Sequence, residues 1–195
     1  DLPISNGYYI QETQAPYAYI RNSKDVYSFN FNVLPETQAK ATFSHTFVND
    51  RTTAKIHIYK VDKESGKAVA QGDASLEGAV YGLYARNDIV HPDGATGVVF
   101  KAGDLVATLT TDKNGEADVN NLYLGNYYVK EITPSEGYLL DEEEHDVVCD
   151  YEGDLVAEVS RSTTSAEQVI KQPFQLIKVS DNGDDTEAGL LSTTR

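Results

Sequence analysis

The segment GYYIQETQAPYAY, at residues 7–19, recurs with small changes as GNYYVKEITPSEGY at residues 125–138. In both copies apolar or aromatic residues alternate with polar ones and a proline-containing turn follows, as in a β-strand with one buried face. A second segment, KIHIYKVD at residues 55–62, recurs as QLIKVSD at residues 175–181. Residues 7 and 125 are 118 positions apart, and so are Lys60 and Lys178. Equal spacings indicate tandem units of this length.

The repeat predicts one complete module and two partial ones. Residues 1–50 would form the C-terminal half of a first module, residues 51–172 a complete second module, and residues 173–195 the first strand of a third. The sequence has no initiator methionine and no signal peptide at its start. We therefore expect it to be an internal piece of a longer protein.

The remaining sequence also alternates with a period of two residues, and turn-forming clusters such as PDG at residues 92–94 separate the runs. There is no long capped helical pattern, and one short turn is expected at residues 163–168. The pattern predicts an antiparallel all-β sandwich or barrel, and we expect immunoglobulin-like sandwiches. Further strands are expected at residues 26–33, 43–49, 55–61, 79–85, 105–110, 127–132, 146–151, 155–159 and 174–179.

Composition excludes several function classes. The 195 residues include 31 acidic and 16 basic ones, which gives a formal charge of −15, and the acidic residues are spread along the chain. A chain without a basic stripe is not expected to bind nucleic acid or an anionic membrane. No apolar run approaches the roughly 18 residues of a membrane span, so no membrane insertion is expected. The single cysteine, Cys149, cannot form an internal disulfide and is expected to be half-buried.

No motif predicts a metal, a cofactor or a metabolic reaction. The acidic run at residues 141–146 lacks the ligand spacing of a calcium loop, and the four histidines lack zinc spacing. There is no Gly-x-Ser-x-Gly elbow and no phosphate loop. LPETQ at residues 34–38 differs from a sorting signal at its last position and predicts an inter-strand loop. A hydrolase would need convergent acid and base groups in a cleft, which the sequence does not indicate.

The segments around Lys60 resemble the Cna-B, or SpaA-like (prealbumin-like), module of Gram-positive surface adhesins and pilins. The lysine strand IYKVD (58–62), the turn SGK (65–67) and the strand LEGAVYGLY (76–84) follow the order of that family. Residues 127–138 resemble its glutamate motif, with Ile132 in place of a threonine. FVN at residues 47–49 resembles the end of its terminal strand.

The resemblance implies an autocatalytic isopeptide bond between a first-strand lysine and a last-strand asparagine, assisted by a glutamate. The matching residues are Lys60 and Glu131 in the complete module, Glu12 and Asn49 in the first, and Lys178 in the third. Alternation places Lys60 and Glu131 on buried faces, where burial favours a neutral amine and a protonated carboxyl. Residues 169–171, ending in Lys171, are expected where the complete module should have its asparagine.

Because a lysine cannot serve as acceptor, two outcomes stay open for the complete module: an isopeptide bond, which is the less favoured, or no cross-link, in which case Lys60 and Glu131 form a buried ion pair. A neighbouring chain could also add its Lys178 strand beside Asn49, as in β-augmentation.

Together these features predict a structural stalk or adhesin segment rather than an enzyme. It would extend or present a binding tip outside the cell, beside neighbouring modules of the same polypeptide. A part of the parent protein beyond this sequence would anchor it to the cell wall. The alternative is a module that itself binds a host protein or glycan through the long loop at residues 87–103. That loop carries Ile89, Val90 and Val98, which are expected to be exposed.

Overall fold

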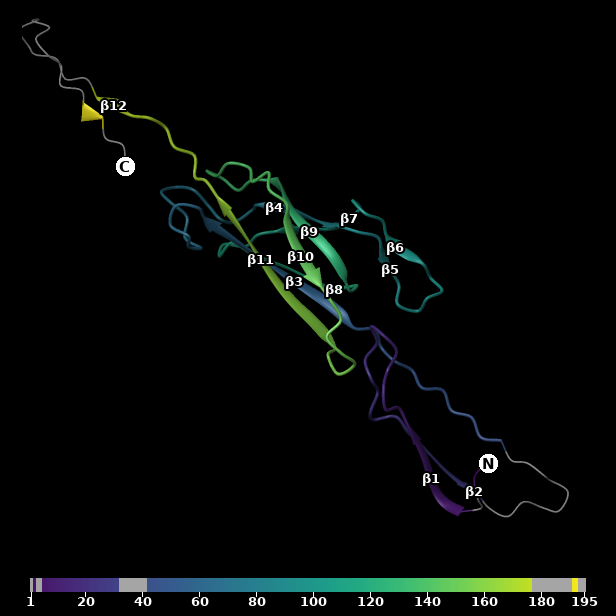
Figure 1. Cartoon of the computed structure of the whole chain (residues 1–195). Coiled ribbons are helices and arrows are strands. Elements are labelled where there is room, and N and C mark those ends of the chain that lie inside the picture. The colour runs from purple at the N-terminus through teal and green to yellow at the C-terminus, as the bar shows by residue number, and fades with distance from the viewer. Residues whose placement is uncertain (1, 3–4, 32–41, 177–190, 193–195) are drawn as a thin grey trace, which may run out of the picture.

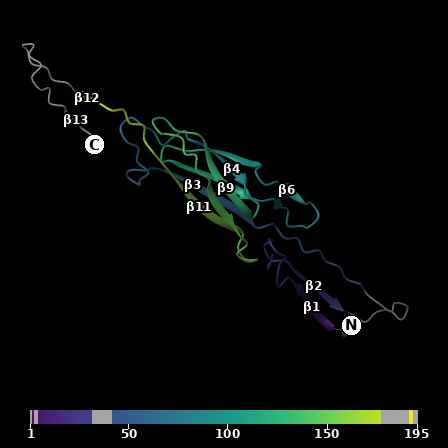
Figure 2. The same cartoon turned by 45° about the horizontal axis from the view of Figure 1, so that its top comes forward.

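The computed structural model describes residues 2, 5–31, 42–176 and 191–192. It is elongated, with a central β-body, an N-terminal hairpin at one end and strand β12 at the other (Figure 1). The view in Figure 2, turned by 45°, shows the same order of parts. The hairpin, the central body and β12 follow one another along a line.

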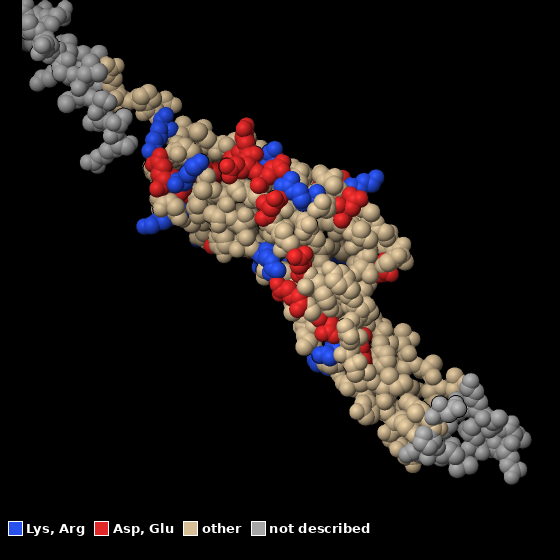
Figure 3. All heavy atoms as spheres, viewed as in Figure 1, with Lys and Arg blue, Asp and Glu red and all other residues tan. Residues whose placement is uncertain are grey.

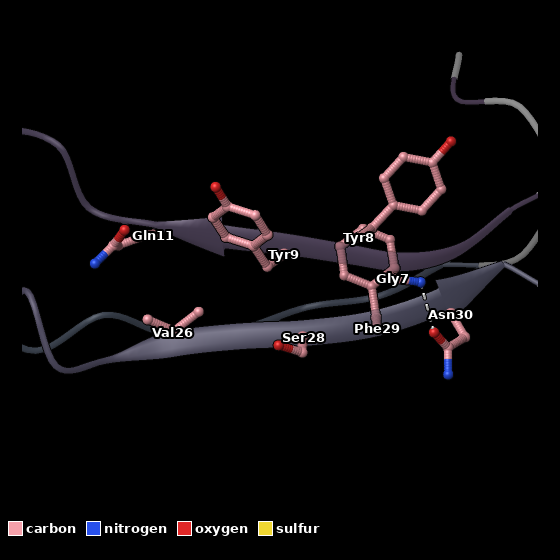
Figure 4. Close-up of a pocket in the computed structure, with 8 residues that line it drawn as sticks. All are labelled: Gly7, Tyr8, Tyr9, Gln11, Val26, Ser28, Phe29 and Asn30. Carbon is pink, nitrogen blue, oxygen red and sulfur yellow. Dashed lines mark hydrogen bonds between the residues drawn. The ribbon is translucent and has the colours of Figure 1, made fainter.

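The N-terminal part is a two-stranded antiparallel hairpin of β1 (Ser5–Gln11) and β2 (Val26–Phe31). The ring of Tyr8 stacks on that of Phe29, with 5.5 Å between the centroids. A hollow of about 450 Å³ lies along the hairpin, and Figure 4 shows the Gly7 N–H donating to Asn30 Oδ1 there (2.8 Å). Residues 43–49 contact the hairpin through aromatic rings but form no strand, contrary to the sequence prediction.

The central body contains two main sheets. The first is antiparallel and has the order β10 (His145–Cys149), β9 (Gly125–Thr133), β4 (Val80–Ala85) and β7 (Leu105–Thr110). The second has the order β11 (Glu158–Glu167), β3 (Thr53–Asp62) and β8 (Glu116–Leu122). Two short hairpins complete the described strands, β5 (Ile89–Val90) with β6 (Val98–Phe100) and β12 (Gln175–Leu176) with β13 (Leu191–Ser192).

Alternation along the strands decides which side chains fill the core between the two sheets. Ile56 and Ile58 of β3 are fully buried, as are Tyr81 of β4 and Val129 of β9, and all four belong to one hydrophobic cluster. Cys149 of β10 is fully buried rather than half-buried as predicted, and burial raises the pKa of its thiol to about 11. The predicted all-β sandwich is confirmed.

Strands β3 and β11 are the first and last of the central body, and they run parallel. Their register extends from Glu158 opposite Thr53 to Glu167 opposite Asp62. The chain therefore enters β3 at one end of the body and leaves β11 at the other, as Figure 1 shows. This parallel pairing differs from the antiparallel pairing that the sequence pattern predicts.

Two strands of the main sheets differ clearly from their prediction. β11 covers residues 158–167, so the short turn expected at residues 163–168 is wrong. β8 was not predicted, because its sequence EADVNNL has few apolar residues.

The surface of the central body mixes charges of both signs on the face seen in Figure 3. Within the described ranges there is no helix long and apolar enough to cross a membrane.

Candidate functional site

Lys60 lies on the buried face of β3. The alternation that buries Ile56 and Ile58 also buries Lys60, and all three are 0% exposed. Lysine is almost never fully buried without a partner, because removing its charge from water is costly. The structure supplies partners from β9 and β11.

Two glutamates face the Lys60 amine. Glu131, on β9, places its Oε1 3.4 Å from Lys60 Nζ. Glu167, the last residue of β11, contacts the same Nζ through its Oε2. All three side chains are 0% exposed, and the ring of Tyr138 covers the amine with its centroid 4.8 Å from Nζ. One amine is thus shared by two acids in a dry pocket.

Polar groups from other strands hold the two carboxyls. The Tyr81 hydroxyl donates to Glu167 Oε1 over 2.5 Å. Ser165 Oγ lies 3.2 Å from that same oxygen and 2.8 Å from Asp141 Oδ2, so its single proton can serve only one of them at a time. The backbone N–H of Asp141 donates to Glu131 Oε2 over 2.8 Å. Asp141 is therefore linked to both glutamates.

Burial dominates the protonation of this cluster. It lowers the pKa of Lys60, although the charges of Glu131 and Asp141 act in the opposite direction. Burial raises the pKa of Glu131, against the Asp141 N–H bond and the Lys60 charge. Burial alone would raise the pKa of Asp141, but hydrogen bonds from His145 and Ser165 bring it below its usual value. A neutral amine and a protonated Glu131 are favoured more strongly here than in water.

The structure brings Lys60 and Glu131 together as the sequence predicted, and it adds Glu167, which the sequence analysis missed. Lys171 lies elsewhere, on the surface, where its Nζ is 2.7 Å from a Glu64 oxygen. The placement of the acceptor at residues 169–171 is therefore wrong. The 118-residue repeat spacing, applied to Asn49, leads to Glu167 and was the signal that could have found it.

The predicted pair in the N-terminal part also meets. Asn49 Nδ2 donates to Glu12 Oε2 over 2.7 Å and to the carbonyl oxygen of Ile20 over 2.8 Å. Both side chains belong to partly buried residues. Lys178, the predicted lysine of the third module, lies outside the described residues.

The same backbone bridge follows Asn49 in the N-terminal part and Glu167 in the central body. An isolated antiparallel bridge joins Tyr19 to Arg51, two residues after Asn49, and another joins Tyr138 to Val169, two residues after Glu167. The N-terminal part thus repeats the local backbone pairing found at the end of the central body.

Two other expectations concern the surface. No metal site was expected. Asp141, Glu143 and His145 have potential ligand atoms within 4.8 Å of one another, but a 2.8 Å hydrogen bond between His145 and Asp141 accounts for much of this proximity, and we assign no metal.

In the loop at residues 87–103, Val90 and Val98 are exposed as predicted, whereas Ile89 is buried in the core.

Comparison with known proteins identifies similar folds. A family profile described as SpaA, prealbumin-like fold domain, matches residues 54–163. No curated protein sequence matches the chain. The solved structure of the Bacillus anthracis TIE protein is 21% identical and covers 91% of this chain and 28% of its own, with a TM-score of 0.61. This likeness concerns the fold.

Two pilins are similar over smaller parts of the chain. The minor pilin GBS52 of Streptococcus agalactiae is 23% identical over 67% of this chain and 48% of its own, with a TM-score of 0.40. The major pilin SpaD of Corynebacterium diphtheriae is 16% identical over 59% of this chain and 30% of its own, with a TM-score of 0.38. The chain spans less than half the length of each of these three solved structures.

Proposed function

The chain belongs to the SpaA family of prealbumin-like fold domains, and we propose that it is a structural segment of a Gram-positive cell-surface stalk or adhesin. In this role it extends or presents a binding tip outside the cell, and it carries out no metabolic reaction. Its partners are the neighbouring modules of the same polypeptide. A part of the parent protein beyond this sequence anchors it to the cell wall.

The proposed modules are residues 1–50, 51–172 and 173–195. The bridge between Tyr19 and Arg51, which repeats that between Tyr138 and Val169, supports a boundary shortly after residue 50 and another after residue 170. The linear order of the parts in Figure 1 also suits modules joined end to end.

The parallel β3–β11 ladder is the observation that carries this proposal. Tension applied along the chain pulls β3 from its start and β11 from its end, so the two strands slide past each other. In that geometry all the hydrogen bonds of the ladder, which covers ten residues of each strand, resist together. Opening the same ladder from one end would break its bonds one after another.

Single-molecule pulling tests this mechanical role. Handles attached at Arg51 and Gln172 load β3 and β11 in opposite directions, whereas handles at Arg51 and Glu158 peel the ladder open from its shared end. We expect a several-fold higher rupture force in the first geometry. The Glu131→Gln variant is used for both, so that the result does not depend on a covalent bond. Equal forces in the two geometries would reject the mechanical role.

A lysine–asparagine isopeptide bond remains a proposal for the N-terminal part only. Glu12 and Asn49 are the assisting and accepting groups that such a bond requires, and their hydrogen bond supports this assignment. The lysine would come from a strand outside the described residues, either upstream in the parent protein or the Lys178 strand of a neighbouring chain. In the central body, among the described residues, no hydrogen bond or ion pair joins Lys60 to an asparagine.

A second candidate function is binding of a host protein or glycan by the loop at residues 87–103. Exposed Val90, with His91, lines a hollow of about 300 Å³ that also includes Tyr17 and Tyr123, and such an apolar hollow favours this alternative. Glycan-array and pull-down binding that is lost when residues 91–97 are shortened would support it. Binding that survives the shortening, or no binding at all, would argue against it.

A further inference from the structure

We propose that Lys60 and Glu167 are joined by an amide bond, formed with release of water and assisted by Glu131. This cross-link would tie the first strand of the central body to its last. The acceptor is a glutamate, where the resemblance implies an asparagine. The inference does not depend on the stalk role, because it concerns chemistry inside the central body alone.

Strand register brings the two reacting side chains together. Ser165 of β11 lies opposite Lys60 of β3, and Glu167 follows two residues later on the same buried face. The long side chain of Lys60 reaches this residue, and its Nζ contacts Glu167 Oε2. Reacting groups held in contact in one geometry gain a large effective molarity.

The two oxygens of Glu167 have different surroundings. Oε1 accepts a hydrogen bond from Tyr81 and lies 3.2 Å from the Ser165 hydroxyl. Apart from the Lys60 amine, which it contacts, buried Oε2 has no hydrogen-bond partner among the described residues. This asymmetry suits condensation: the Tyr81 hydroxyl, joined by Ser165 when its proton turns from Asp141, stabilises negative charge that develops on Oε1, and Oε2 is the oxygen that leaves.

Burial also makes the charged pair unfavourable compared with an amide. A buried lysine and glutamate keep a desolvation cost that their attraction does not fully offset. Moving the Lys60 proton to a carboxyl gives a neutral amine, which is a nucleophile. Condensation then removes both ionisable groups from the dry interior and releases a water molecule to solvent.

The step balances in atoms and electrons without any further reagent. The lone pair of Lys60 Nζ attacks Cδ of protonated Glu167, and the new N–C bond forms as negative charge moves onto Oε1. Protonated Glu131, with Oε1 3.4 Å from Nζ, gives its proton to the departing Oε2 and takes one from the nitrogen, so that it ends the step protonated as it began. The Cδ–Oε2 bond breaks, and one water molecule leaves.

Intact mass measured on the denatured full chain tests the proposal. We expect the wild type to be lighter than its sequence by one water, and Glu131→Gln, a near-isosteric variant, to keep its full mass. In the variant Glu167→Gln the same amide would form with loss of ammonia, so its product has the same mass as the wild-type product. Lys171→Ala removes a surface lysine and serves as the matched control, with the loss of water unchanged.

The position of the loss must also be established, because ring closure at Asp93-Gly94 would release water too. Tandem mass spectrometry of a protease digest should find the peptides that contain Lys60 and Glu167 joined to each other. Circular dichroism of each variant shows whether it is folded. An unmodified wild-type mass, or a loss that maps to any other residue, would overturn the proposal.

Discussion

At the scale of single residues, Ser165 is a polar residue at a buried position of β11 where an apolar residue would be expected. Its position on the buried face of β11 would suit an apolar side chain, but it is a serine 1% exposed between Asp141 and Glu167. A buried hydroxyl is retained at little cost when it is hydrogen-bonded. We interpret Ser165 as the group that orients the acceptor carboxyl.

The variant Ser165→Ala should therefore slow amide formation without abolishing it. Removal of a dedicated oxyanion donor costs about a hundred- to a thousand-fold in rate. Because Ser165 shares its proton with Asp141, we expect a loss at or below the lower end of that range, about a hundred-fold at most. The measurement is a time course of intact mass after refolding. Ser162→Ala, on the exposed side of the same strand, is the control. Equal rates for both variants would remove Ser165 from the mechanism.

The variant Lys60→Met should make stability fall as pH rises. Burial raises the pKa of Glu131 in the folded state above its ordinary value of 4.5, and Lys60 opposes that rise. Without Lys60 the folded protein holds the Glu131 proton more tightly than the unfolded chain. Its contribution is then fully present below about pH 4.5 and is lost as pH rises through the folded pKa.

Urea unfolding of Lys60→Met between pH 4 and pH 8 would show this trend. Each tenfold difference in the proton affinity of Glu131 between the folded and unfolded states changes the free energy of unfolding by about 1.4 kcal/mol. The amide-linked wild type, which lacks the free Lys60 amine and the free Glu167 carboxyl, should depend less on pH over the same range. Stability of the variant that increases with pH would contradict the assignment of Glu131 as a buried acid.

Lys60 and Glu131 could be predicted from the sequence because each alternates with apolar neighbours that must be buried. Glu167 could not be found by alternation, since the segment STTSAEQ around it is polar on both faces. Its inward positions are polar because Ser165 and Glu167 form part of the site. A search for alternating apolar residues therefore cannot detect this part of the site, because its buried residues are polar.

At the scale of elements, the turn before β8 fixes the end of β3. Gly115 has a φ of +77°, and its carbonyl accepts the Lys60 N–H over 2.7 Å. A Cβ at this position would lie 2.6 Å from the Lys60 carbonyl oxygen. Only glycine meets both the backbone conformation and the close approach.

Gly115→Ala should thus destabilise the central body by about 3 kcal/mol, from a left-handed backbone cost of about 1 kcal/mol together with the clash. Gly66→Ala is the matched control, because Gly66 has a φ of +66° but no atom within 4 Å of its Cβ position. It should lose only about 1 kcal/mol. Urea unfolding midpoints compare the two, and equal losses would show that contact with Lys60 has no energetic effect.

Strand prediction succeeded where one face carries large apolar residues and failed where the inward residues are small or polar. β3, β4 and β9 alternate clearly and were predicted to within about two residues. Most of β11 was taken for a turn because inward positions such as Ser165 and Glu167 are polar. β8 was missed because its inward residues Ala117 and Val119 are small and lie among polar ones. The parallel pairing of β3 and β11 depends on contacts between residues about 105 positions apart, which no local pattern contains.

At the scale of the whole molecule, the proposed amide closes a loop of 107 residues, from residue 60 to residue 167. Restricting the unfolded chain in this way should stabilise the wild type over Glu131→Gln by about 4–5 kcal/mol, by analogy with a disulfide of similar loop length. Calorimetric melting of the two proteins would measure the difference. Identical melting temperatures in a protein shown to be cross-linked would mean that the unfolded chain gains little freedom without the bond.

The parallel arrangement of β3 and β11 also determines which residues a stretched filament strains. Only 11 positions separate Glu167 from Lys178 in the sequence. With an amide at each junction, tension runs along β3 to Lys60, crosses to Glu167 and continues into the following copy, bypassing everything between. In the proposed stalk, the bypassed residues, which include the loop at 87–103, would carry little of the load. Substitutions among them should then leave the tensile strength of the fibre unchanged.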